Sequence, residues 1–201
     1  MRTNTRTFPA AEIVPESYLA PIAFDQIFVR VAPVEVDLGC GDGTFLVALG
    51  QANPARDFVG VEKLVGRVRG ATRKIGDRGL TNARILRAEI LHAVQHHFAP
   101  KSVDAFHLMF PDPWPKRRHE SRRSFNETFL RAVARALRVG GTLHVATDDA
   151  EYFAVMQTVA ARATHLFHAD ESSARELPAS TFEARFRERG LPIHRLSLRK
   201  V

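Results

Sequence analysis

Short runs of apolar, mostly β-branched residues recur along the chain and alternate with stretches of helical periodicity. Such runs, bounded by glycine, proline or polar clusters, are typical of strands. Because helical stretches separate the first five runs, those strands are expected to pair in parallel through crossover connections. The pattern therefore predicts an α/β fold, a doubly wound, mostly parallel seven-stranded sheet with helices on both faces. Its strands are expected at residues 34–38, 57–61, 83–86, 103–109, 142–146, 165–168 and 193–198.

The clearest helical pattern covers residues 124–139. Ser124, with Glu127 three positions later, is typical of a capping box, and Gly140 with Gly141 provides a stop signal. Between these signals, apolar residues follow one another at helical spacing and form a single stripe. The stripe consists of Phe125, Phe129, Val133 and Ala136 or Leu137.

Length and composition fit one globular domain. The chain has 201 residues, of which 45% are hydrophobic and 25% charged. No apolar run approaches the roughly 20 residues that span a bilayer, and the first thirty residues lack the apolar stretch of a secretory signal. The single cysteine, Cys40, excludes an intrachain disulfide and a cysteine-based zinc site. We expect a cytoplasmic protein with no membrane association, with residues 1–31 as an N-terminal arm and 32–201 as a single domain.

A glycine-rich loop follows the first predicted strand. Asp37 precedes Gly39, Gly41 and Gly43 in the order acidic-x-G-x-G-x-G. Glycines between a strand and a helix permit a tight turn and let a ligand approach the main chain. The carboxylate would repel a pyrophosphate but attract a cationic amino-acid group, so the loop favours S-adenosylmethionine over a dinucleotide. A tight turn without a ligand is the alternative interpretation.

Carboxylates recur at the ends of the predicted strands. Glu62 follows the last glycine of the loop by nineteen residues, a position from which it could accept both ribose hydroxyls of an adenosine. Glu89 follows the third strand and could accept the adenine amino group. Asp112 and Asp148 follow the fourth and fifth strands. Because parallel strands bring their carboxyl ends to one sheet edge, we expect these four side chains and Asp37 to gather at a ligand site.

A proline-rich and then basic segment follows the fourth predicted strand. Prolines at 111, 113 and 115 deny the loop regular hydrogen bonding and stiffen it around Asp112. Trp114 could stack on a base, although burial against the core is the alternative. The basic run lies beside the predicted site, which favours phosphate contacts over a merely solvated face. The run contains Lys116, Arg117, Arg118, Arg122 and Arg123.

The distribution of charge points to a polyanionic partner. The formal net charge is +7 and the isoelectric point is about 10.3. A basic domain favours nucleic acid, although the charge could serve solubility alone. Residues 116–123 hold five basic side chains and one acidic, and residues 181–201 hold six and two, so the remaining chain nets −1. These two segments are expected to meet around an RNA backbone.

Several motifs together resemble one family. They are PDPWPKRRHESRR at residues 111–123, the glycine loop, the strand end Ala146-Thr147-Asp148, and Ser180-Thr181-Phe182-Glu183. Over about residues 34–198 the chain resembles the bacterial tRNA (guanine-N7-)-methyltransferases. The resemblance implies a Rossmann-like class I methyltransferase fold. It also implies transfer of a methyl group from S-adenosylmethionine to N7 of a guanine in tRNA, at position 46 of the variable loop.

The resemblance further implies roles for individual residues. Cofactor contacts are expected from Asp37, Gly39, Gly41, Gly43, Glu62, Glu89 and Asp112, and Asp112 is also the catalytic position. Substrate contacts are expected from Lys116, Arg118, His119, Arg122, Arg123, Asp148, Ser180, Thr181, Phe182 and Glu183. Ser121 and Thr181 stand where the family usually has a basic residue, which bears on the strength of RNA binding more than on the reaction.

The expected chemistry needs no general base. Guanine N7 carries a lone pair and no hydrogen, so holding it in line with the methyl group would supply most of the catalysis. We expect the carboxylates of Asp112 and Asp148 to accept hydrogen bonds from guanine N1–H and N2–H₂, which would orient the ring and offset its developing positive charge.

Two other functions remain open from the sequence. Asp112-Pro113-Trp114 is close to the D/N-P-P-Y/F/W motif of amino-methyltransferases that act on adenine or cytosine, although the order of residues differs. The chain could also be a non-catalytic tRNA-binding protein of the same fold. A metal site is not expected: His92, His96 and His97 have no acidic third ligand at matched spacing.

Overall fold

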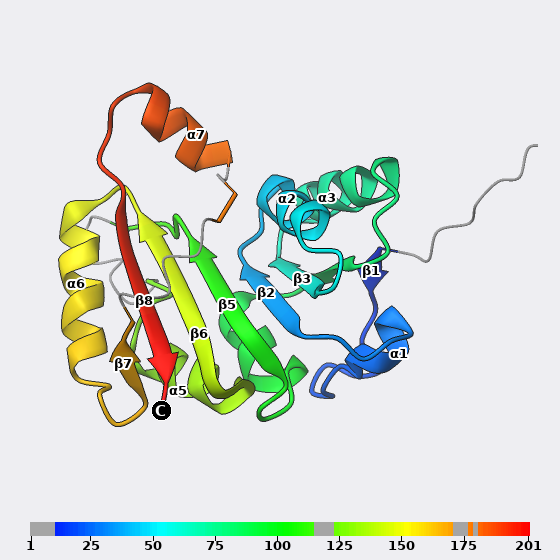
Figure 1. The fold of residues 1–201 in the computed structure, drawn as a ribbon, viewed down its shortest axis with the longest axis horizontal. Helices are drawn as coiled ribbons and strands as arrows, with labels where there is room; N and C mark the ends of the chain where they lie inside the picture. Colours follow the sequence, from blue (N-terminus) through cyan, green and yellow to red (C-terminus); the bar gives the residue numbers. More distant parts are fainter. Residues whose placement is uncertain (1–10, 115–122, 171–176, 179–180) are drawn as a thin grey trace, which may run out of the picture.

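The computed structural model describes residues 11–114, 123–170, 177–178 and 181–201, and of residues 181 and 182 the backbone alone. Within these ranges one sheet has the order β1-β4-β3-β2-β5-β6-β8-β7 (Figure 1). Its strands are β1 (Glu12–Ile13), β2 (Val34–Leu38), β3 (Asp57–Glu62), β4 (Ala83–Arg87), β5 (Val103–Met109), β6 (Leu137–Thr147), β7 (Phe167–Ala169) and β8 (His194–Lys200).

The helices follow the strands in alternation through most of the described chain. They are α1 (Phe24–Phe28), α2 (Thr44–Ala52), α3 (Val65–Asp77), α4 (Ile90–His92), the π-helix η1 (Ala93–His97), α5 (Glu127–Ala136), α6 (Ala150–Ala161) and α7 (Thr181–Glu188). None of the described helices is long and apolar enough to cross a membrane.

Strand β2 lies where the sheet changes its direction of growth. The chain adds β3 and β4 on one side of β2, then returns to add β5 and β6 on the other, and all these neighbours pair in parallel. Only β8 runs antiparallel, between β6 and β7. Such a reversal opens a crevice at the carboxyl ends of β2 and β5, where open α/β sheets bind their ligands.

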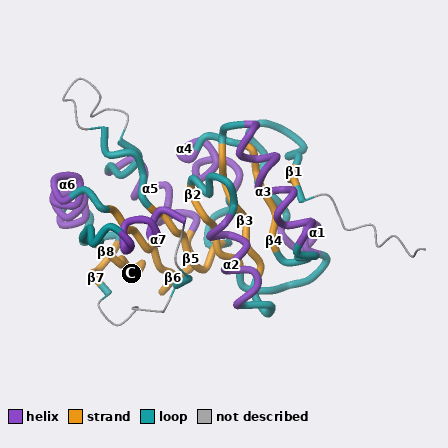
Figure 2. Tube along the Cα trace, turned by 90° about the horizontal axis from the view of Figure 1, so that it is seen from above, coloured by secondary structure: helices purple, strands orange, loops and turns teal. Residues whose placement is uncertain are grey.

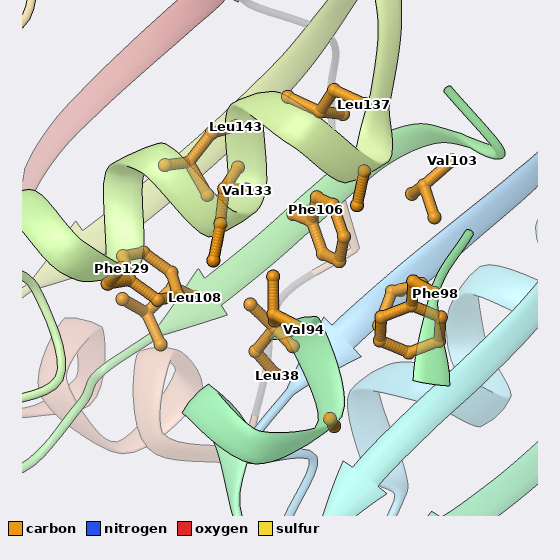
Figure 3. Close-up of a cluster of buried hydrophobic side chains, with 14 of the residues drawn as sticks. Leu38, Val94, Phe98, Val103, Phe106, Leu108, Phe129, Val133, Leu137 and Leu143 are labelled. Atoms are coloured by element: carbon orange, nitrogen blue, oxygen red, sulfur yellow. The ribbon is translucent and has the colours of Figure 1, made fainter. Parts of the chain in front are cut away.

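Helices cover both faces because the central strands bury side chains on both sides. On one face Phe58 and Ile85 pack under α2 and α3. On the other face the adjacent residues Val59 and Leu86 join a larger core formed with η1, α5 and α6. Figure 3 shows part of this core, with Phe106 of β5 between side chains of the helices and strands. The view from above shows helices on either side of the strands (Figure 2).

The predicted fold class is confirmed, with one difference in strand number. All seven predicted strands are present, five of them with shifted ends, and the short strand β1 adds an eighth. β1 lies inside residues 1–31 and pairs with the outer strand β4. Two residues are too few to show a periodic pattern, which is why the sequence did not reveal this strand.

The predicted helix at 124–139 is wrong at both ends. Asn126, and not Ser124, caps α5, since its side chain accepts the Phe129 N–H at 2.9 Å. At the other end Leu137 already has extended backbone and begins β6. Gly140 and Gly141 therefore lie inside a strand, beside an irregularity in the β5–β6 register, and do not stop the helix.

Residues 11–31 are held to the domain by histidines near η1. The His97 Nδ1 atom lies 3.0 Å from the Ala20 carbonyl oxygen, and the Ile22 N–H donates to the His97 carbonyl at 2.9 Å. His92 Nε2 lies 2.9 Å from the Tyr18 carbonyl oxygen, and the two rings stack. These histidines thus fix a chain segment, while the division of the chain at residue 31 stays a prediction.

Candidate functional site

The five carboxylates singled out from the sequence share one edge of the sheet. Asp37 lies in β2 and Glu62 ends β3, while Glu89, Asp112 and Asp148 follow β4, β5 and β6. These five strands are neighbours and parallel, so their carboxyl ends meet at the crevice described above. The arrangement combines a glycine loop and several acidic groups at the place where this fold class binds ligands.

The glycine loop depends on backbone conformations that favour glycine. Gly39, Gly41 and Gly43 have φ angles of 79°, 57° and 77°. The N–H groups of Gly39 and Cys40 both donate to the Val61 carbonyl, at 2.8 and 3.0 Å, which ties the loop to β3. A Cβ atom on Gly43 would lie 2.6 Å from the Ala71 Cβ, whereas one on Gly41 would meet nothing within 4 Å. Gly43 thus permits α2 to pack on α3, and Gly41 leaves open space above the loop.

Asp37 is a buried carboxyl with an unused oxygen. Its exposed fraction is 3%, and its Oδ2 atom has no hydrogen-bond partner in the described part of the chain. Burial, and then the nearby charge of Glu62, raises the pKa of Asp37 to about 8. A buried group of this kind can bind a cationic donor that restores its ionised form. Asp42, the other acid of the loop, is already paired with Lys74, whose Nζ atom lies 2.6 Å from Oδ2.

Glu62 and Glu89 use one oxygen each to shape the backbone around them. Glu62 is buried, and its Oε1 atom accepts the Leu64 N–H at 2.9 Å ahead of α3. Glu89 is exposed and caps α4, with Oε2 accepting the His92 N–H at 3.1 Å. Glu89 also borders a pocket of about 310 Å³ between α4 and the start of α5. The other residues that line this pocket are Ile90, Leu91, Arg123, Ser124, Asn126 and Phe129.

Asp112 and Asp148 are the uncommitted carboxylates of the site. Asp112 is exposed and Asp148 half-buried, and neither forms a hydrogen bond or ion pair with the described residues. The adjacent Asp149 caps α6 instead, with Oδ1 accepting the Tyr152 N–H at 2.7 Å. The charge of Asp112 contributes to the raised pKa of Tyr152, after burial as the main cause, so the two groups lie close enough to interact.

The structure gives Arg123 an internal contact that the sequence did not predict. Its Nε atom donates to the Pro113 carbonyl at 2.8 Å, and its guanidinium carbon lies 5.3 Å from the centre of the Tyr152 ring. Tyr152 itself was missed because a single tyrosine on an apolar helix is indistinguishable from a core residue in sequence. Several of the predicted substrate contacts lie outside the described residues: Lys116, Arg118, His119, Arg122, Ser180 and the side chains of Thr181 and Phe182.

Acidic side chains neutralise much of the C-terminal basic segment. Glu183 is buried and pairs with Arg187 and with Arg195, the latter at 2.5 Å. Asp170 pairs with Arg199 at 2.5 Å. Three of the six basic residues in 181–201 are therefore paired with acidic side chains of the protein, which reduces the charge that this segment can offer to an RNA backbone.

Comparisons with known proteins agree with this geometry. A family model described as "Putative methyltransferase" matches residues 31–196. The tRNA (guanine-N(7)-)-methyltransferase of Halorhodospira halophila (strain DSM 244 / SL1) is 40% identical over 65% of this chain and 57% of its own length. The protein of the same name from Pseudomonas fluorescens (strain Pf0-1) is 35% identical over 90% of this chain and 78% of its own length. The chain thus spans less than two thirds of the Halorhodospira relative.

Solved structures show the same fold at low sequence identity. The 16S rRNA methyltransferase KamB has a TM-score of 0.63 at 17% identity, covering 88% of this chain and 92% of its own. The structure of an antibiotic-related methyltransferase has a TM-score of 0.65 at 18% identity, covering 94% and 96%. This likeness shows a Rossmann-like class I methyltransferase fold, and the match of residues 31–196 to the family model shows that the chain is a member of a methyltransferase family. From its match to the relatives above, the chain belongs to the tRNA (guanine-N(7)-)-methyltransferase family.

Proposed function

We propose that this protein transfers the methyl group of S-adenosylmethionine to N7 of a guanine in tRNA, at position 46 of the variable loop. The observation that carries the proposal is the pair of uncommitted carboxylates, Asp112 and Asp148, beside a glycine loop at the sheet crevice. Relatives that cover most of the chain carry the name of this activity. A cytoplasmic location and tRNA as the partner follow from the same proposal.

The residues around the glycine loop fit the cofactor. S-adenosylmethionine would supply an electrophilic methyl group on its sulfonium centre. The unused Oδ2 atom of Asp37 suits the ammonium of the methionine part, and the open space over Gly41 leaves the backbone accessible. Glu62 has a second oxygen that can accept ribose hydroxyls. Glu89, which lines the pocket between α4 and α5, can accept the adenine amino group.

The other half of the crevice suits a guanine. Carboxylates of Asp112 and Asp148 can accept hydrogen bonds from guanine N1–H and N2–H₂, which would fix the ring plane. Methylation at N7 leaves the ring positively charged, and two nearby carboxylates stabilise that charge as it develops. Because N7 carries no proton, these residues need only orient the base and stabilise charge.

Incubation with labelled S-adenosylmethionine and unmodified tRNA tests the proposal. We expect label in the tRNA, and cleavage specific to 7-methylguanosine at one site in the variable loop. A tRNA with another base in place of that guanine is the matched control and should take up no label. Label recovered as N6-methyladenine or a methylated cytosine would instead identify an amino-methyltransferase.

Calorimetry tests the remaining alternative, a non-catalytic tRNA-binding protein. We expect the purified chain to bind S-adenosylmethionine without tRNA, since the loop and Asp37 belong to the folded sheet. Binding of tRNA with no detectable binding of S-adenosylmethionine would show a non-catalytic RNA-binding protein. Because the two ligands are tested separately, a negative result identifies which half of the site fails.

A further inference from the structure

The last side chain of the basic run, Arg123, holds the loop that carries Asp112. Arg123 donates from Nε to the carbonyl of Pro113, the residue directly after Asp112, at 2.8 Å. The same guanidinium lies over the ring of Tyr152, 5.3 Å from its centre, at a distance where cation–π attraction is significant. One arginine therefore joins the loop after β5 to helix α6.

Tyr152 is itself fixed by several contacts. The residue is fully buried, and its hydroxyl accepts the Phe125 N–H at 3.2 Å, close to the start of α5. Its backbone N–H donates to Asp149, the residue next to Asp148, at 2.7 Å. Tyr152 thus provides a rigid support that contacts the segments around both uncommitted carboxylates.

The backbone on either side of Asp112 needs such support. Phe110 and Trp114 have φ angles of 54° and 45°, in the left-handed region that residues with a Cβ rarely adopt. Each such residue costs about 1 kcal/mol or more and persists only where its surroundings enforce it. The Phe110 N–H bonds to the Ala146 carbonyl at 2.7 Å, which fixes the near end of the loop. The bond from Arg123 to Pro113 fixes the far end.

We propose that Arg123 and Tyr152 form a clamp that positions Asp112, so that Arg123 governs turnover and not the binding of tRNA phosphates. The catalytic consequence rests on the proposed function, whereas the effect on the loop does not. A displacement of about 1 Å in an orienting group can lower a rate by about 100-fold. Arg123 and Tyr152 are positioning residues, since they act on the reaction through Asp112.

Kinetics of matched variants test the catalytic part. Arg123→Met removes the donor and the charge, and we expect kcat to fall about 10- to 100-fold while KM for tRNA stays within about twofold. Arg123→Lys keeps a charge and a donor and should restore most of kcat. Tyr152→Leu should resemble Arg123→Met, and the double variant should be no worse than either, because both break one clamp. Arg131→Met is the control: Arg131 lies on the exposed side of α5, paired only with Glu127.

The fluorescence of Trp114 tests the clamp without reference to activity. Trp114 is the only tryptophan in the chain and follows Pro113 directly. We expect Arg123→Met to raise the acrylamide quenching constant of Trp114 about twofold, with unchanged circular dichroism, and Arg131→Met to leave it unchanged. If the wild-type protein made no 7-methylguanosine, the proposed function would be wrong. The quenching of Trp114 would still show whether Arg123 holds the loop.

The dependence of tRNA affinity on salt decides between a clamp and a phosphate contact. A phosphate contact contributes about 0.7 to 0.9 to the slope of log affinity against log salt. We expect Arg123→Met to leave this slope unchanged. A lower slope and higher KM at normal kcat would show that Arg123 binds phosphate, and unchanged quenching would show that it does not hold the loop. Either result overturns the proposal.

Discussion

The two halves of the crevice hold their carboxylates in different ways. On the β2–β3 side, Asp37 and Glu62 lie within strands, are buried by the sheet, and adjoin a loop tied to β3 by backbone hydrogen bonds. On the β5–β6 side, Asp112 and Asp148 lie in loops, are more exposed, and depend on contacts made by their neighbours in the chain. The first half is built by the backbone, the second by a few side chains.

The difference teaches where each half is vulnerable. Backbone pairing of parallel strands is shared among many residues, so no single surface side chain should alter the cofactor half. The substrate half has open carboxylates and a strained loop, which keeps acceptors free for a base but makes their positions sensitive to distant residues. Four predictions test this difference between the two halves.

Gly43→Ala should have the largest effect. The new Cβ would lie 2.6 Å from the Ala71 Cβ, and alanine also disfavours the φ of 77°. We expect the free energy of unfolding to fall by about 3 kcal/mol, measured by urea denaturation. Gly41→Ala is the matched control: it has a positive φ but no neighbour within 4 Å, so it should lose only about 1 kcal/mol. Equal losses for the two variants would contradict the packing role of Gly43.

Replacing an aspartate of either half with asparagine should have the second largest effect, and the two variants should change different constants. Asp112→Asn should lower kcat about 100-fold and leave the affinity for S-adenosylmethionine within about threefold, because Asp112 is exposed and bound to no described residue. Asp37→Asn should instead lower the affinity for S-adenosylmethionine by about tenfold or more. Glu127→Gln, an exposed acid on α5, is the control for both. If both aspartate variants changed the same constant, the division into halves would be wrong.

Proton release on cofactor binding should give the smallest signal. The pKa of Asp37 is about 8 without ligand, so at pH 7 this carboxyl is mostly protonated. A cationic ammonium would lower that pKa, and binding at pH 7 should release up to about one proton. Calorimetry in buffers of different ionisation enthalpy measures this release. We expect less proton release at pH 9, where Asp37 is already ionised. The same proton release at both pH values would show that Asp37 does not bind the cofactor.

The same pKa sets the sign of a stability effect. The unfolded chain ionises Asp37 near pH 3.8, whereas the folded chain keeps the proton up to about pH 8. Between these values the folded state binds more protons, so the contribution of Asp37 to the free energy of unfolding declines as pH rises. Asp37→Asn should flatten that part of the pH profile, which thermal unfolding at pH 5 and pH 9 can measure.

Local patterns were enough to predict the strands and the shared edge. Residues 34–38 and 103–109 form strands with the predicted bounds, because apolar runs between turn signals are encoded locally. The alternation with helices predicted parallel pairing, and parallel pairing brings the five acids to one edge. The sequence could therefore predict that these acids share one sheet edge without any knowledge of side-chain contacts.

Contacts between distant elements could not be predicted in this way. The bond from Arg123 to Pro113 and the pairs of Glu183 with Arg187 and Arg195 turn side chains inward that a charge pattern treats as a surface. The start of α5 was predicted wrongly for a related reason. Ser124 and Asn126 are both favourable N-cap residues, and in the folded protein the cap is Asn126. The kinds of residues at the predicted site could be identified from their order along the chain, whereas tertiary packing decides which of them pair with other side chains.

The hydrogen bond between Arg123 and Pro113 also links two points that are separated along the chain. The two residues lie ten positions apart in the sequence, and the bond brings them together in space. A loop whose base is closed can change sequence or length with little effect on the chain outside it. We therefore expect exchanges in the residues between them to leave Asp112 in place, so that under the proposed function they would change the binding of RNA and not the orientation of the base.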